Sequence, residues 1–309
     1  MKKVLPSRAR ILSILFVLGS FFLFSARGAS ASGHLPIVFR DETGSAPFED
    51  VTYVTESPFP EGTELLQVDF LGIRQGDCIL ITSRGETMLL DGGETIRFDF
   101  VNSYFEEHGI DHLDYMFLTH AHDDHLEIQQ RLIKRGFPVG RFYSPYDEND
   151  AWTLWKPLLS LLEEKEIPHE KVSTGDVLRV GDAELTVFRN TSDGLSMNDQ
   201  SASVMLRYKD ASVFLTADIA GITQHWLCDN FGDALDADIM KSPHHGITTN
   251  VAEFLDRVSP GLVVITNDKS NAGKYDAQLD RLNIPRVFIF YTVHLQTDGA
   301  MWYVWTDRK

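Results

Sequence analysis

Six residues, 120–125, hold three histidines and two aspartates, and they directly follow an apolar run at 113–118 that has the pattern of a buried strand. Imidazole and carboxylate groups together form a ligand set suited to zinc and similar divalent ions. We therefore predict that His120, His122, Asp124 and His125 bind metal, two side chains to one ion and two to a second. A solvated polar turn is the alternative, and it is a poor interpretation of so dense a cluster.

The remaining pattern predicts strands and helices in both halves of the chain. Short apolar or alternating runs bounded by turn residues indicate strands at 65–71, 78–82, 87–90, 113–118, 139–143, 177–180, 184–189, 203–208, 212–216, 237–241, 262–266, 287–290 and 301–305. Helices are expected at 96–108, 124–135, 151–165, 222–231, 251–258 and 277–282. This order favours an α/β fold of two facing mixed sheets with helices on the outer faces, a four-layer αββα sandwich. We expect it to form one domain at 62–309.

The N-terminal 61 residues have a different composition. A basic start is followed by an apolar run at 11–24 and by the small residues Ala29-Ser30-Ala31, which is the layout of a secretory signal peptide cleaved near Ala31. An uncleaved N-terminal anchor is the alternative, although the run is short for a membrane span. Residues 32–61 are rich in Gly, Pro, Ser, Thr and acidic residues, so we expect a linker or an irregular extension.

Charge restricts the partners that the chain can bind. The formal net charge is −17, and removing residues 1–31 makes it more acidic, because they hold five basic residues and no acidic one. Such a surface repels polyanions, which argues against a groove that tracks long nucleic acid. A small phosphodiester, or a nucleic-acid strand drawn to bound metal cations, remains compatible with it.

The pattern His120-x-His122-x-Asp124-His125 resembles the signature loop of the metallo-β-lactamase superfamily. The resemblance extends from about residue 65 to residue 305. It implies that Asp91 supports the metal loop from behind, that Asp218 is the carboxylate shared by the two metals, and that His245 is the last ligand, with His244 near the substrate.

A narrower likeness concerns four further segments. They resemble the metallo-β-lactamase-like domain of the DNA-uptake channel ComEC and secreted bacterial phosphorylcholine esterase. The segments are 69–77 (DFLGIRQGD), 198–201 (NDQS), 215–218 (LTAD) and 241–246 (KSPHHG). Gln75 and Asp77 are expected to be structural or to face the substrate, not to bind metal.

The chain departs from the wider superfamily at one position. Many members have a histidine between the first cluster and the shared carboxylate, and here that place holds Asn198 and Asp199, while His169 comes too early. The resemblance thus implies an open first site with His120 and His122, and a second site with Asp124, His125, Asp218 and His245. Asn198 is open between a polar group of the site and a turn residue, and Asp199 between a supporting residue and a turn.

These features predict a secreted hydrolase with two divalent ions, zinc or alternatively manganese, acting on a phosphodiester in a nucleic-acid strand or a small molecule. Two such ions can share a bridging water and lower its pKa towards neutrality, with Asp124, His244 and Asn198 as the expected catalytic side chains. A metal-binding protein without catalysis is one alternative on the same fold. A hydrolase of thioesters, esters or lactams is another.

Two cysteines and a group of aromatic residues each allow two interpretations. Cys78 and Cys228 are expected to be buried unpaired thiols, with a disulfide as the alternative. The aromatic residues of the segment after the first metal helix are expected to belong to the core, with an aromatic cage for a choline group as the alternative. They are Tyr143, Tyr146, Trp152 and Trp155.

Overall fold

The computed structural model of the protein describes residues 35–39 and 58–307. The predicted signal peptide lies outside the described residues, as does most of the predicted extension. Among the helices that are described, none combines the length and apolar character needed to cross a membrane.

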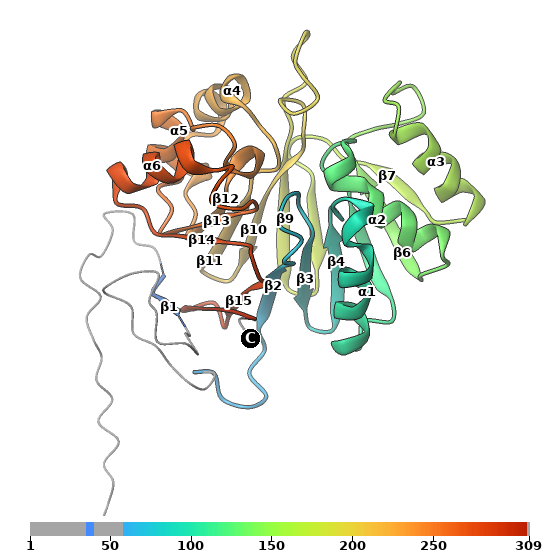
Figure 1. Ribbon diagram of the computed structural model, residues 1–309, viewed down its shortest axis with the longest axis horizontal. Helices are drawn as coiled ribbons and strands as arrows, with labels where there is room; N and C mark the ends of the chain where they lie inside the picture. Colours follow the sequence, from blue (N-terminus) through green and yellow to red (C-terminus); the bar gives the residue numbers. More distant parts are fainter. Residues whose placement is uncertain (1–34, 40–57, 308–309) are drawn as a thin grey trace, which may run out of the picture.

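Within the described residues the strands form two sheets (Figure 1), one of nine strands and one of seven. The first sheet has the order β1-β16-β15-β2-β3-β4-β5-β6-β7. Its strands are β1 (Ile37–Phe39), β2 (Leu66–Phe70), β3 (Ile79–Ser83), β4 (Glu86–Leu90), β5 (Leu113–Phe117), β6 (Val139–Ser144), β7 (His169–Lys171), β15 (Val293–Thr297) and β16 (Trp302–Thr306). The second sheet has the order β14-β13-β12-β11-β10-β9-β8. Its strands are β8 (Val177–Val180), β9 (Ala183–Phe188), β10 (Ser203–Tyr208), β11 (Ala211–Leu215), β12 (Ile239–Lys241), β13 (Leu262–Ile265) and β14 (Arg286–Phe288).

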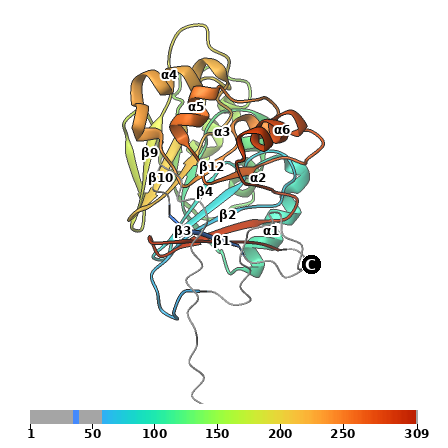
Figure 2. The same cartoon turned by 90° about the vertical axis from the view of Figure 1, so that its left-hand side faces the viewer.

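Helices cover the outer face of each sheet (Figures 1 and 2). On the first sheet these are α1 (Phe98–Glu107), preceded by the 3-10 turn η1 (Thr95–Arg97), α2 (Asp123–Lys134) and α3 (Trp155–Glu164). On the second sheet they are α4 (Gly221–Phe231), α5 (Ala252–Val258) and α6 (Gly273–Leu282), with the 3-10 turns η2 (Gly232–Leu235) and η3 (Pro243–Gly246). The predicted αββα sandwich is therefore confirmed.

Two hydrophobic clusters hold the layers together. The larger one contains inward-facing residues of both sheets together with the buried faces of α1, α2 and α3. The smaller one lies under α4, α5 and α6 and is built on residues such as Phe214 and Met240 of the second sheet. Burial of this apolar surface is the main favourable contribution to folding.

Parallel pairing determines where the polar loops gather. In the first sheet β4, β5 and β6 run parallel, and in the second β11, β12, β13 and β14 run parallel. The carboxyl ends of parallel strands lie at one edge of a sheet, which is where ligand-binding loops collect in α/β folds. The loops after β4, β5, β11, β12 and β13 all leave from such edges.

Three short or polar strands were not expected from the sequence. The strand β1 lies inside the stretch expected to be irregular, and it pairs in parallel with β16 at the edge of the sheet. The strand β7 has three residues, too few for an alternating pattern. The strand β15 contains His294 and Gln296, which interrupt the apolar run that would indicate a strand. The sheet accommodates His294 because its partner in the neighbouring strand is Asp69.

His294 forms a buried ion pair in the first sheet. Its Nδ1 lies 2.7 Å from Oδ1 of Asp69 and its Nε2 lies 2.8 Å from Oδ1 of Asp307, while its ring stacks on Trp305 with 4.8 Å between centroids. Burial alone would lower the pKa of His294, but the hydrogen bonds to Asp307 and Asp69 raise it to about 9.

This raised pKa predicts a pH-dependent stability. The contribution of His294 is fully present below its ordinary pKa of 6.5 and is lost as the pH rises through about 9. Relative to the exposed-site control His225→Gln, we expect His294→Gln to lose about 3 kcal/mol of unfolding free energy at pH 6 and progressively less towards pH 9.5. Urea unfolding across this range measures the difference, and profiles that stay parallel for both variants would contradict the expectation.

Candidate metal centre

The loop after β5 is held in place by Asp91, the first residue after β4. Its Oδ1 accepts a hydrogen bond from the backbone N–H of Thr119 at 2.8 Å, and its Oδ2 accepts one from the hydroxyl of Thr119 at 2.7 Å. The same Oδ2 lies 2.7 Å from Nδ1 of His125. Asp91 is fully buried. It therefore supports the metal loop without facing its centre, as the family resemblance implies.

Hydrogen bonds at Nδ1 turn the Nε2 atoms of three histidines towards one another. Nδ1 of His120 lies 3.0 Å from the Thr119 hydroxyl, Nδ1 of His125 contacts Asp91, and Nδ1 of His245 lies 2.9 Å from the hydroxyl of Thr266, directly after β13. Partners of this kind at one ring nitrogen fix the orientation in which the other can bind a metal.

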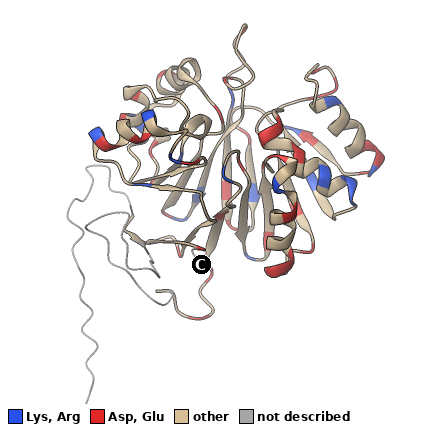
Figure 3. Cartoon of the chain, in the orientation of Figure 1, with Lys and Arg blue, Asp and Glu red and all other residues tan. Residues whose placement is uncertain are grey.

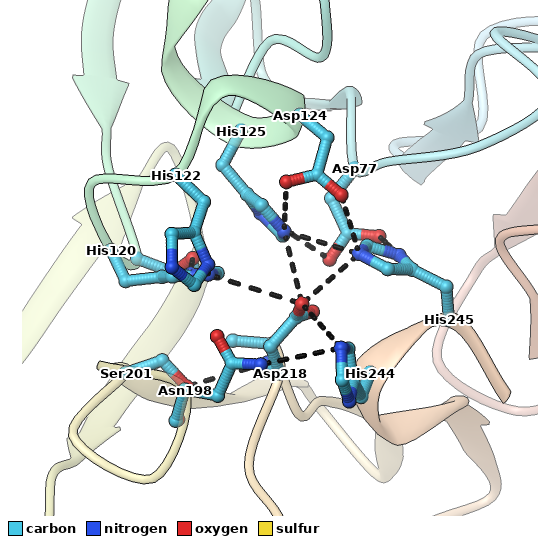
Figure 4. Close-up of polar contacts among 12 residues, drawn as sticks. Asp77, His120, His122, Asp124, His125, Asn198, Ser201, Asp218, His244 and His245 are labelled. Atoms are coloured by element: carbon cyan, nitrogen blue, oxygen red, sulfur yellow. Dashed lines mark hydrogen bonds and ion pairs between the residues drawn. The ribbon is translucent and has the colours of Figure 1, made fainter. Parts of the chain in front are cut away.

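One donor set centres on His125 and His245. Their Nε2 atoms are 3.2 Å apart, and Oδ2 of Asp218 lies 3.4 Å from the first and 3.1 Å from the second. Oδ2 of Asp124 lies 3.3 Å from Nε2 of His245. Figure 4 shows these four side chains converging from the α2 N-terminus, from the loop after β11 and from η3.

The other donor set contains His120 and His122. Nε2 of His120 lies 2.9 Å from Nδ1 of His122 and 3.9 Å from Oδ2 of Asp218. Two nitrogen lone pairs that face each other at this distance require a proton or a metal cation between them. Asp218 thus faces both donor sets, and the arrangement is that of a candidate dinuclear metal site.

Asp77, in the loop between β2 and β3, was expected to be structural or to face the substrate, and the structure places it beside two histidines of the centre. Its carboxylate belongs with His125, Asp218 and His245 to a group whose ligand atoms lie within 4.8 Å of one another. It approaches the two histidines at Nδ1, at 4.0 Å from His125 and 3.3 Å from His245. Because Nδ1 points away from the convergent Nε2 atoms, we assign Asp77 to orienting the rings rather than to binding metal.

Gly76 allows the Asp77 loop to approach α2. A Cβ atom at Gly76 would lie 2.5 Å from the carbonyl oxygen of Asp124, and its φ of +98° is one that other residues rarely adopt. The Gly-Asp pair that precedes the apolar strand β3 was the sequence signal for this contact.

Lys241, the last residue of β12, is a residue of the centre that sequence reasoning missed. It is fully buried, and its Nζ lies 2.6 Å from Oδ2 of Asp77 and 3.4 Å from Oδ1 of Asp218. Burial alone would lower the pKa of Lys241, but these two carboxylates raise it above its ordinary value. Burial alone would raise the pKa of Asp77, but the positive charge of Lys241 and the contact with His245 bring it well below its usual range.

The centre holds more negative than positive charge. Asp77, Asp91, Asp124 and Asp218 face it or lie behind it, and Lys241 is the one lysine or arginine with an ion pair to them among the described residues. Buried carboxylates in such numbers require compensating cations. The donor set, nitrogen and carboxylate oxygen, fits divalent metal ions, so the residues present suit the group that the sequence predicts.

Strained backbone surrounds the ligands. Ala217, His244 and His245 all have positive φ, at +50°, +48° and +53°. Non-glycine residues adopt this conformation at a cost of about 1–3 kcal/mol each, and such residues cluster at functional sites. The turn made by His244 and His245 aims the two rings differently: His245 is fully buried among the carboxylates, whereas the His244 side chain is 27% exposed.

The structure also places the remaining predicted site residues. Nε2 of His244 lies 3.2 Å from Nδ2 of Asn198 and 3.9 Å from Oδ2 of Asp218, so both residues line the edge of the centre. Asp199 does not contact a ligand. Its Oδ1 accepts hydrogen bonds from the backbone N–H groups of Ala220 and Thr223, at 3.1 Å and 3.2 Å, where α4 begins.

The cysteines and the aromatic residues that follow α2 belong to the core. Cys78 and Cys228 are buried free thiols. Tyr146 and Trp155 are fully buried, Tyr143 is nearly so, and Trp152 is partly buried and packs against the larger hydrophobic cluster, so the four form part of the core rather than an aromatic cage. Tyr146 does support the metal loop, because its hydroxyl accepts a hydrogen bond from the N–H of Ala121 at 3.2 Å.

A comparison with known families agrees with this geometry. The profile of the metallo-beta-lactamase superfamily matches residues 71–265, more than half of the chain. The chain belongs to the metallo-β-lactamase superfamily. The matched segment begins just before Asp77 and ends just before Thr266, so it contains every residue of both donor sets.

Individual relatives support the fold and the narrower likeness. ComE operon protein 3 of Bacillus subtilis is 26% identical, over 66% of this chain and 29% of the relative, so the chain corresponds to under a third of that protein. Among solved structures, CmlA, a diiron beta-hydroxylase from Streptomyces venezuelae, has a TM-score of 0.51 at 16% identity, covering 78% of this chain and 55% of CmlA. The metallo-beta-lactamase fold protein YhfI from Bacillus subtilis has a TM-score of 0.50 at 14% identity, covering 73% of this chain and 96% of YhfI.

The buried ion pair predicts a measurable energetic coupling. In metal-free protein, Lys241→Met should lower the unfolding free energy by about 3–5 kcal/mol, because Asp77 and Asp218 lose their buried partner. Adding Asp77→Asn to this variant should lower the unfolding free energy by less than Asp77→Asn lowers it in the wild type. Urea unfolding of the wild type, both single variants and the double variant measures the coupling, with the exposed Lys274→Met as control. Effects that add to within about 0.5 kcal/mol would contradict a direct interaction.

Proposed function

We propose that this protein is an exported, dinuclear-metal-dependent phosphodiesterase. The observation that carries the proposal is the position of Asp218 between the His120–His122 pair and the set formed by Asp124, His125 and His245. One carboxylate between two donor sets is the arrangement expected for two metal ions at close range. A phosphodiester suits such a pair, because its two non-bridging oxygens can each face one ion.

Bound divalent ions would supply Lewis-acid polarisation of a phosphoryl oxygen and would activate water near neutral pH. His120, His122 and Asp218 are the residues that would hold one ion, and Asp124, His125, His245 and Asp218 those that would hold the other. Zinc fits this nitrogen and carboxylate set, and manganese is the alternative.

The protein side chains contribute orientation and hydrogen bonding. Asp91, Asp77 and Thr266 fix the imidazole rings through their Nδ1 atoms. His244 is partly exposed beside Asp218, where it can hydrogen-bond to substrate, and burial lowers its pKa, which favours the neutral ring. Asp124 is 17% exposed, which places its carboxylate where it can receive a proton or pass one to the leaving group.

Charge favours a small phosphodiester over long nucleic acid. On α2 the first turn, next to the metal loop, carries Asp123 and Asp124, and the basic residues Arg131 and Lys134 lie in the last turn, away from the centre (Figure 3). Binding of long nucleic acid depends on phosphate neutralisation by many basic groups. A phosphodiester of small size, or the end of a single strand, meets this surface with less repulsion.

The test compares metal content and turnover in a double variant. His122→Ala/Asp124→Ala removes one ligand from each donor set, so we expect metal content to fall from about two ions per chain towards zero, and hydrolysis of bis-p-nitrophenyl phosphate to fall by about 100-fold or more. The matched control His225→Ala/Asp229→Ala changes the same residue types at exposed positions of α4 and should behave as wild type.

Further substrates separate this proposal from other functions. Single-stranded DNA and phosphorylcholine esters are tested beside thioester and β-lactam substrates. If metal-loaded protein hydrolyses none of the phosphodiesters, the phosphodiesterase assignment is wrong. Turnover of acyl substrates alone would indicate an acyl hydrolase, and metal binding without any turnover would indicate a binding protein.

Export is proposed from residues 1–31, which lie outside the described structure. We expect the protein to be recovered outside the cytoplasm with a new N-terminus near residue 32. N-terminal sequencing measures this directly. A chain that retains Met1 and sediments with membranes would indicate an anchor instead.

A further inference from the structure

Asn198 occupies a fixed position between β9 and β10. Its backbone carbonyl oxygen accepts hydrogen bonds from the N–H and the hydroxyl of Ser201, at 3.0 Å and 2.7 Å. The next residue, Asp199, is tied to the start of α4. The hydroxyl of Ser201 also accepts a hydrogen bond from the N–H of Asp218 at 3.3 Å. The backbone of Asn198 is therefore linked to the segment that carries the shared carboxylate.

The two ends of the Asn198 amide have different surroundings. Nδ2 lies 3.2 Å from Nε2 of His244 and donates to it. Oδ1 is buried and has no hydrogen-bond partner among the described residues. A buried carbonyl oxygen without a partner is unfavourable, so such an atom in a structured site calls for an explanation. In Figure 4 this oxygen points towards the side of the centre that holds His120 and His122.

The donor set of His120 and His122 lacks a partner of its own. In the other set, Asp124 and His245 form an ion pair. Outside the pair itself, Asp218 is the one imidazole or carboxylate of the described residues that forms a hydrogen bond or ion pair with His120 or His122. His169 lies elsewhere, 2.9 Å from the hydroxyl of Ser144 and packed against Trp155. The set thus contains two nitrogens, one shared carboxylate oxygen and a nearby unpartnered amide oxygen.

We infer that Oδ1 of Asn198 is the third protein ligand of the metal held by His120 and His122. The hydrogen bond to His244 holds the Nδ2 end of the amide against that ring, which leaves Oδ1 available to the metal. The inference depends on metal binding at this centre, but not on the reaction that the protein catalyses.

An amide oxygen gives this site a distinct metal preference. It is neutral and is a harder ligand than imidazole, so it binds zinc less strongly and is better suited to manganese or magnesium. The set with Asp124, His125 and His245 has one more ionisable ligand. The two sites should therefore fill in order, the Asp124–His125–His245 site at lower metal concentration and the Asn198 site at higher concentration.

Metal titration of the apoprotein tests the inference without any activity assay. Wild-type protein should take up Co²⁺ in two phases of visible absorption, and competition with a chelator should give two affinities. Asn198→Ala should weaken the second phase by about tenfold or more and leave the first unchanged. Asn198→Asp, which keeps an oxygen and adds a charge, should restore or tighten the second phase, and Asn198→His should shift its absorption bands because nitrogen replaces oxygen.

Two control variants separate a ligand from a structural residue. Asn190 lies in the same loop but bonds to Thr223 through its Nδ2, at 3.2 Å, so Asn190→Ala should leave both phases intact. His244→Ala removes the partner of the Asn198 amide, and it should change the second phase less than Asn198→Ala does. Circular dichroism of the apoproteins confirms that each variant is folded.

Three results would overturn the inference. These are a single phase in the wild type, an Asn198→Ala variant with both phases unchanged, and an Asn198→His variant whose absorption bands match those of the wild type. A protein that binds metal as described but cleaves no phosphodiester would keep this inference and lose the proposed function.

Discussion

A single buried ammonium group, that of Lys241, joins the two sheets at the point where the candidate metal ligands meet. It reaches from the end of β12 to Asp77 of the first sheet and to Asp218 of its own sheet. Without this charge, two carboxylates would lie close together in a region of low dielectric, where their repulsion is strong. The position of Asp218, and therefore the geometry of both donor sets, depends on this interaction.

The same interaction explains how the histidines face inward. Asp77 remains ionised beside Lys241, and it meets His125 and His245 at Nδ1. Asp91 acts in the same way on His125 and on the metal loop. The imidazoles of His120, His125 and His245 are thus fixed at Nδ1 by a carboxylate or a hydroxyl, which leaves Nε2 for a metal ion. Orientation of this kind is provided before any metal arrives.

Features that are local in sequence could be predicted, and features that depend on distant partners could not. The cluster at 120–125 is visible because four candidate ligands lie on one loop, and the αββα sandwich follows from the order of strands and helices. Lys241 and its ion pair with Asp77 were missed because the pair joins residues far apart in the chain, and a lone lysine in an apolar strand reveals no partner. Asp199, expected to support the site or form a turn, holds the start of α4, a contact that sequence spacing cannot show. The short strands β1 and β7 form because neighbouring strands offer them backbone partners, and such tertiary effects override local propensity.

The division of the ligands between the two sheets has a consequence for folding. His120, His122, Asp124 and His125 follow β5 of the first sheet, whereas Asp218 and His245 follow β11 and β12 of the second. Metal ions bound here would cross-link two layers that are otherwise held together by apolar side chains and by the Lys241–Asp77 ion pair. Free metal at 100 times its dissociation constant would add about 2.7 kcal/mol per ion to the folded state. Removal of the metal by a chelator would then weaken the contact between the two layers. The resistance of the protein to proteolysis would therefore depend on the metal concentration in its surroundings.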